Sequence, residues 1–134
     1  KWRGFQGKAN IYGRSYETLT HGAALGALTK RIAIFSTVHV PLVTPAFAAK
    51  AIATIDHITH GRAGLNIVCG WNEDEFQMFG VTQHEHDERY AQGEEWWSIV
   101  KRIWAGAAPF DYAGTHYQLR GVEDHQDPTL LTLR

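Results

Sequence analysis

The chain has 134 residues, of which 44% are hydrophobic and 20% charged, and its formal net charge is -1. These values are typical of one soluble globular unit and give no indication of a nucleic-acid or membrane partner. No window holds eighteen consecutive apolar residues, and the amino terminus lacks the apolar stretch of a signal peptide, so we expect neither a transmembrane helix nor secretion. A single cysteine, Cys69, excludes an internal disulfide and favours a reducing, cytoplasmic location.

The first half of the chain predicts helices and strands in alternation. Ser15 is expected to cap a helix that runs to about Lys30, and its small residues would let that helix approach a sheet closely. A buried strand over residues 32–40 follows, and a second helix begins at Thr44-Pro45 and ends near Thr59. Gly61 is expected in the left-handed position after that helix. An apolar strand at 63–68 completes a right-handed βαβ unit with parallel strands.

The second half predicts a polar excursion, a helix and a hairpin. Residues 72–87 contain few apolar side chains, and loops of this length are usually functional. A tryptophan-rich helix is expected from His86 or Asp87 to Trp104. Residues 110–119 alternate about a turn at Ala113-Gly114, which predicts a β-hairpin. Two central strands cannot form a complete sheet or barrel, so we favour a segment of a larger α/β fold over a small complete α/β sandwich.

Candidate site residues gather after the two strands. Ligands in α/β folds bind beyond the carboxyl ends of strands, where the acidic run 73–75 lies, and Asn66 is near the end of the strand that precedes this run. Thr37 and Asn66 are polar residues within otherwise apolar strands, and a buried polar group without a partner costs about 1–3 kcal/mol. Each must therefore bond a neighbour or face a ligand, and together they can converge on one pocket. Arg89 and Tyr90, near a helix amino end, suit an anion such as phosphate, although a surface arginine and a core tyrosine remain the alternative.

Two other sets of reactive side chains have simpler explanations. The run of residues 84–87 and the pair His57 and His60 contain possible metal ligands, but their spacing does not match a zinc motif. We therefore interpret these histidines as solvated or capping side chains and predict no metal site. Cys69 has no basic neighbour in the sequence that would stabilise a thiolate, so we interpret it as a buried filler.

Three segments of the chain form a recognisable pattern: ATIDHITHGRAGLNIVCGWNEDEFQMFG, HDERYAQGEEWWSIVKRIWAG and FDYAGTHYQL. They resemble the bacterial luciferase-like flavin monooxygenases, and within this family the branch of alkanesulfonate, dimethyl-sulfone and pyrimidine monooxygenases. The resemblance implies a TIM (β/α)8 barrel, of which residues 1–134 would supply part of one domain. That part would hold about strands 3 and 4, their helices, an insertion at about 70–88 and the hairpin.

The same resemblance implies an enzyme that uses reduced FMN from a separate flavin reductase, together with O2, to oxygenate a small organic substrate. By motif position, Lys1, Asn66, Glu75, Arg89 and Tyr90 would contact FMN, with Arg89 and Tyr90 on the phosphate or ribityl side. Thr37 and Asn66 would line the oxygen pocket and are the expected catalytic residues. His39 stands where the related pyrimidine enzymes carry a small residue, so the resemblance leaves the substrate open.

Two alternative functions remain at this stage, and a homo-oligomer is expected. A deazaflavin-dependent oxidoreductase is possible because that cofactor is used on the same barrel. A non-catalytic flavin-binding or assembly module is also possible, with the tryptophan-rich helix as its contact face.

Overall fold

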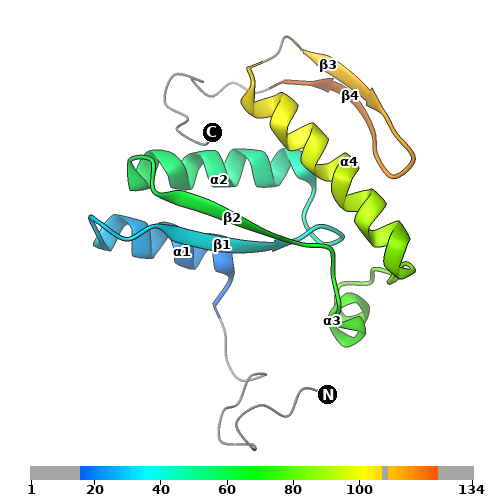
Figure 1. Ribbon diagram of the computed structural model, residues 1–134, viewed down its shortest axis with the longest axis horizontal. Coiled ribbons are helices and arrows are strands. Elements are labelled where there is room, and N and C mark those ends of the chain that lie inside the picture. The colour runs from blue at the N-terminus through cyan, green and yellow to red at the C-terminus, as the bar shows by residue number, and fades with distance from the viewer. Residues whose placement is uncertain (1–15, 107–108, 124–134) are drawn as a thin grey trace, which may run out of the picture.

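A computed structural model describes residues 16–106 and 109–123 of the chain (Figure 1). The predicted cap Ser15, the predicted FMN ligand Lys1 and the end of the chain lie outside these residues. The elements, in chain order, are α1 (Thr18–Leu28), β1 (Ile34–His39), α2 (Pro45–Thr59), β2 (Ala63–Val68), α3 (Glu73–Met78), α4 (His86–Trp104), β3 (Phe110–Ala113) and β4 (Gln118–Val122).

The predicted βαβ unit is present with parallel strands. β1 pairs with β2 in a register that matches Thr37 with Asn66 and His39 with Val68. β3 and β4 form a separate antiparallel pair, which confirms the hairpin and extends it to Val122. The described residues thus hold two two-stranded sheets and no closed barrel.

Helix α1 lies close against β1 and α2 because glycines line its inner face. A Cβ atom on Gly22 would lie 2.2 Å from the Ser36 hydroxyl oxygen, and one on Gly26 would lie 2.3 Å from a Thr59 methyl carbon. The close approach predicted from the small residues is therefore confirmed. The predicted cap is wrong, since Glu17 is the N-cap and its carboxylate accepts hydrogen bonds from the Leu19 and Thr20 amides. A glutamate can reach these free amide groups as a serine does.

Helix α2 begins as the sequence predicts, with Thr44 at the N-cap position and Pro45 in the first turn, although the Thr44 side chain makes no capping bond. At its end Gly61 has the left-handed φ predicted for it, 83°. His60 before it is the C-cap and is also left-handed, with φ 54° and ψ 51°. The amides of His60 and Gly61 bond the carbonyl groups of His57 and Asp56, which stabilises this turn.

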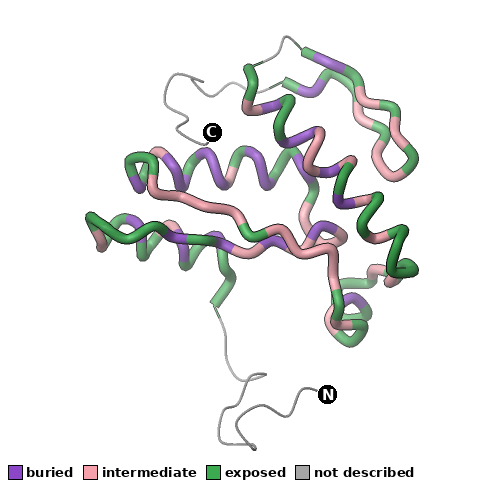
Figure 2. The backbone as a smooth tube through the Cα atoms, in the orientation of Figure 1, coloured by how far each residue is buried: buried purple, intermediate pink, exposed green. Residues whose placement is uncertain are grey.

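The tryptophan-rich helix α4 packs on α2 and supplies much of the core (Figures 1 and 2). Trp96 is fully buried, and its indole N–H donates to the Val43 carbonyl oxygen at 2.7 Å. The Trp104 N–H donates to the Ala49 carbonyl oxygen at 3.0 Å. These bonds satisfy the polar atom of each indole inside the fold. Among the described residues, no helix is both long and apolar enough to cross a membrane.

The hairpin is fixed to α4 through Glu95. Its carboxylate accepts hydrogen bonds from the amides of Thr115, His116 and Tyr117, which form the loop of the hairpin. Burial raises the pKa of Glu95, but the three amide donors outweigh that effect and hold the pKa below its ordinary value. The hairpin loop and α4 are thereby joined as one unit.

Candidate active site at the strand ends

One face of the parallel sheet is covered by helices, and the other is open in the described residues. Ser36 and Val38 on β1, and Val40 directly after it, are buried, at 2%, 1% and 1% exposure, on the side of α1 and α2. Phe35 on the opposite face is 71% exposed. An apolar strand such as 63–68 would be expected to be covered on both faces, but β2 is only half-buried among the described residues. The open face is where a ligand could reach the sheet.

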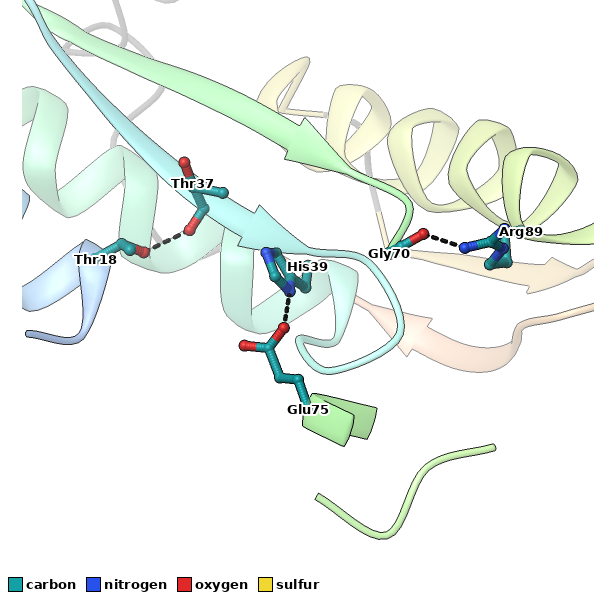
Figure 3. Close-up of polar contacts among 6 residues, drawn as sticks. All are labelled: Thr18, Thr37, His39, Gly70, Glu75 and Arg89. Atoms are coloured by element: carbon teal, nitrogen blue, oxygen red, sulfur yellow. Dashed lines mark hydrogen bonds and ion pairs between the residues drawn. The ribbon is translucent and has the colours of Figure 1, made fainter. Parts of the chain in front are cut away.

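Thr37 and Asn66 meet on this open face. Asn66 Nδ2 donates to Thr37 Oγ1 at 3.1 Å, across the strand register that pairs the two residues. The structure thus brings the two predicted catalytic residues together. Their expected burial is not observed, because Asn66 is exposed and Thr37 is half-buried. The Thr37 carbonyl oxygen also accepts a hydrogen bond from the Thr18 hydroxyl, which fixes β1 to the start of α1 (Figure 3).

The segment predicted as a loop contains a short helix, α3, that lies at the end of β2 (Figure 1). Gly70, with φ 98°, follows β2, and a Cβ atom there would lie 2.1 Å from the ring of Phe76, which is fully buried. Glycine therefore permits both the backbone conformation and the close packing of α3. This packing brings Glu75 to the end of β1, where its Oε2 lies 2.9 Å from His39 Nδ1 (Figure 3).

Arg89 lies at the end of β2 rather than beside the Thr37–Asn66 pair. Its guanidinium donates a hydrogen bond to the Gly70 carbonyl oxygen (Figure 3). Its Nε is buried and has no hydrogen-bond partner among the described residues. The neighbouring Tyr90 is 56% exposed and its ring lies beside that of His86, with centroids 4.9 Å apart and the planes tilted by 44°. The alternative of a core tyrosine is therefore wrong, and the arginine is held by a backbone carbonyl.

Cys69 is half-buried, between the end of β2 and α4, rather than fully buried as expected. Burial raises the pKa of its thiol, and the positive charge of Arg89 only partly opposes this. Tyr117 of the hairpin lies nearby, and burial raises its pKa to about 12. Both side chains thus stay protonated at neutral pH, which agrees with a structural role for the cysteine.

The histidines make separate pairs with acidic residues. His84 Nδ1 lies 3.4 Å from Glu88 Oε1, and His86 Nδ1 lies 3.0 Å from Asp87 Oδ1, both on exposed surface. Within residues 16–106 and 109–123, no three His, Cys, Asp or Glu side chains are placed to hold a metal ion.

An open groove of about 910 Å³ runs beside β1. Its walls are mainly apolar side chains of α1, α2 and α3. Thr37, His39 and Glu75 are among its polar lining. Pockets for small molecules typically combine apolar walls with a few fixed polar groups.

The sequence reasoning missed α3 and the contact between His39 and Glu75. The helix had a signal, because Asn72 precedes an acidic first turn of Glu73, Asp74 and Glu75, as at many helix starts. The contact between His39 and Glu75 had no signal in the sequence, because it joins residues 36 positions apart through a turn that depends on Gly70 and Phe76.

Comparison with known proteins relates the chain to one protein family. The luciferase-like monooxygenase family matches residues 3–131. The pyrimidine monooxygenase RutA of Acinetobacter baylyi is 36% identical over 130 residues, which cover 96% of this chain and 35% of that protein. RutA of Pseudomonas syringae is 34% identical over 128 residues, with coverage of 90% and 34%. The chain thus spans about a third of the length of these relatives.

Solved structures agree in fold. The riboflavin lyase RcaE superimposes with a TM-score of 0.79 at 23% identity, over 89% of this chain and 32% of the other. The EDTA monooxygenase EmoA of Chelativorans sp. BNC1 gives 0.76 at 21% identity, over 81% and 30%. The family match covers nearly all of the sequence, and the two RutA relatives are 34% and 36% identical to it over the aligned residues. The chain belongs to the luciferase-like monooxygenase family.

Proposed function

We propose that the protein is a two-component flavin-dependent monooxygenase, which uses reduced FMN from a separate reductase and O2 to oxygenate a small organic molecule. The observation that carries this proposal is the Thr37–Asn66 pair on the open face of the sheet, near the carboxyl ends of both strands. Family membership and the RutA relatives support the same reaction class.

The residues present are compatible with FMN. The Arg89 Nε is a buried donor with no partner among the described residues, so it is available to an anionic or polar group. Asn66 offers an exposed amide, and Tyr90 an exposed ring. We therefore propose that Arg89 and Tyr90 hold the phosphate or ribityl side, that Asn66 and Glu75 contact the cofactor further in, and that Lys1 contributes as well. When bound, reduced FMN would supply the electrons that activate O2.

The chain's own contribution is a pair of oriented hydrogen-bond donors. Because Asn66 Nδ2 donates to Thr37 Oγ1, the hydroxyl proton of Thr37 is free to point to another acceptor. The second amide proton of Asn66 is free in the same way. Two fixed donors beside each other suit a group on which negative charge develops during oxygen transfer. Thr37 and Asn66 are thus the proposed catalytic residues.

The substrate and assembly are part of the proposal. RutA is named as a pyrimidine monooxygenase, so pyrimidines belong in a first substrate panel beside alkanesulfonates and dimethyl sulfone. The tryptophans of α4 contact the interior, since Trp96 is buried and Trp104 bonds Ala49. This packing disfavours the assembly-module alternative, although a homo-oligomer formed through other surfaces remains our prediction.

An oxygen electrode tests the reaction class. The complete protein is supplied with FMN, NADH and a flavin reductase, and each candidate substrate is added in turn. We expect one substrate class to yield product that contains one oxygen atom from ¹⁸O₂. A deazaflavin-dependent oxidoreductase would instead transfer hydride without consuming O2. Absence of FMN binding, or O2 uptake with no labelled product from any substrate, would contradict the proposal.

A further inference from the structure

The His39–Glu75 pair lies at the polar part of the groove. Glu75 is already a proposed cofactor contact, but the proposed function gives His39 no role. His39 is on the same face of β1 as Thr37, because residues two apart along a strand point the same way. Its side chain is 21% exposed and that of Glu75 is 31% exposed, so both are partly shielded from water. Figure 3 shows the two side chains pointing toward each other from β1 and α3.

The short distance in this pair determines where the imidazole proton lies. Glu75 Oε2 and His39 Nδ1 are 2.9 Å apart. If both atoms presented lone pairs at this distance they would repel each other, so we assign a proton to Nδ1. In the neutral imidazole the other ring nitrogen, Nε2, then carries a lone pair and acts as a hydrogen-bond acceptor.

The position of Glu75 is well supported by packing, so this orientation is built into the fold. Phe76, the next residue, is 1% exposed and packs on Gly70. The Phe76 carbonyl oxygen accepts hydrogen bonds from the amides of Phe79 and Val81, which closes the turn after α3. A carboxylate fixed in this way can hold an imidazole in one tautomer, as carboxylate partners of histidine commonly do.

We propose that His39 is a specificity-determining residue whose Nε2 accepts a hydrogen bond from an N–H or O–H group of the substrate. Glu75 is the positioning residue that accepts the Nδ1 proton and so directs Nε2 of the neutral imidazole toward the substrate. This inference rests on the proposed function, because it assumes that a small substrate enters the site beside Thr37. Apolar groove walls would surround the rest of the molecule, and the single acceptor would select substrates that carry a donor.

Matched probe pairs test the proposal without knowledge of the natural substrate. Methanesulfonamide and dimethyl sulfone are nearly equal in size but differ by an NH2 group in place of a methyl group, and uracil and 1,3-dimethyluracil differ in their two ring N–H groups. Dissociation constants are measured by ligand-observed NMR on the complete protein with FMN bound. We expect the member with N–H to bind about tenfold tighter in at least one pair, as one added hydrogen bond would produce.

Two substitutions at His39 then distinguish the roles of its two ring nitrogens, Nδ1 and Nε2. In His39→Asn the amide reaches the position of Nδ1 and can still donate to Glu75, but nothing replaces Nε2, so the preference should fall below about twofold. In His39→Gln the amide oxygen can reach the position of Nε2, so part of the preference should return. His84→Asn is the matched control, because it removes a His–Glu contact of 3.4 Å on exposed surface and should leave the preference unchanged.

The measurements that test the His39 proposal differ from those that test the proposed function. FMN affinity and reductase-driven O2 uptake test that function, and we expect FMN affinity to be the same in all three variants. The His39 proposal is overturned if the wild-type protein binds both members of every pair equally or binds none. It is also overturned if His39→Asn keeps the tenfold preference.

Discussion

At the scale of single residues, Asn66 and Arg89 are predicted to serve different parts of one site. Asn66 lies on the open sheet face and bonds Thr37, whereas Arg89 bonds the Gly70 carbonyl at the end of β2. We expect Asn66→Ala to lower the rate of oxygen transfer roughly 100-fold, because it removes a fixed donor beside the reaction. Its FMN dissociation constant should change by less than about threefold.

Arg89→Ala should show the opposite pattern. Loss of a charged donor is expected to raise the FMN dissociation constant about 10- to 100-fold, by the usual strength of a charged hydrogen bond. The rate of oxygen transfer at saturating FMN should fall far less. Fluorescence quenching of FMN and product formation measure the two effects separately, with the exposed Arg120→Ala as a control for loss of positive charge. Equal losses of binding and rate in both variants would refute this division of roles.

At the scale of elements, Glu95 provides a pH-dependent connection between α4 and the hairpin. Its carboxylate accepts three amide hydrogen bonds, and its pKa lies below the ordinary value of 4.5. A lowered pKa means that the ionised form stabilises the fold above the ordinary pKa, and that this contribution is lost as the pH falls through the lower, folded-state value.

Glu95→Gln is therefore expected to lower the free energy of unfolding at pH 7 by about 1–3 kcal/mol, because the variant places an amide group against backbone donors. Urea denaturation of the complete protein at a series of pH values measures this. The difference between wild type and variant should begin to shrink as the pH falls below the ordinary pKa of 4.5 and should be lost once the pH passes the lower pKa of the folded state. Glu94→Gln, an exposed neighbour on the same helix, is the control and should have little effect. A difference that stays constant with pH would contradict the role of the charge.

Several elements could be predicted from the sequence because local signals set them. Thr44-Pro45 starts α2 at the expected place, and alternation about Ala113-Gly114 gives the hairpin. Errors arose where partners distant in sequence decide the outcome. Ser15 is a better cap by residue type, but Glu17 is the residue whose carboxylate meets the free amides of α1. Helix α3 is short and depends on Phe76 packing on Gly70.

In the candidate site, too, the features set by local sequence could be predicted, and those set by residues distant in the sequence could not. Thr37 and Asn66 could be paired from the sequence, because a βαβ unit with parallel strands places two neighbouring strand interiors side by side. Their degree of burial could not be predicted, since it depends on what lies over the open sheet face. The His39–Glu75 contact also escaped prediction, because no pattern within either segment specifies the turn that brings them together.

At the scale of the whole molecule, the open face of the sheet is the feature that family membership explains. Phe35 is 71% exposed and its ring lies over Gly64 on β2, where an added Cβ atom would be 2.5 Å from it. A large aromatic side chain on an uncovered sheet face is unfavourable in water. In a TIM barrel, side chains on this face fill the interior of the barrel. We therefore propose that further barrel strands, which lie outside the described residues, cover Phe35 in the complete protein.

This proposal predicts a large effect of Phe35→Ala on stability. If the ring fills a barrel interior, the substitution removes a buried aromatic side chain and should lower the free energy of unfolding by about 3–5 kcal/mol. If the face is in water, as the exposure within the described residues would imply, the effect should be below about 0.5 kcal/mol. Chemical denaturation of the complete protein distinguishes the two, with Glu94→Ala on the exposed side of α4 as the baseline. A small effect would mean that this sheet face lies outside a barrel interior, and the proposed position of Thr37 and Asn66 inside the barrel would fail with it.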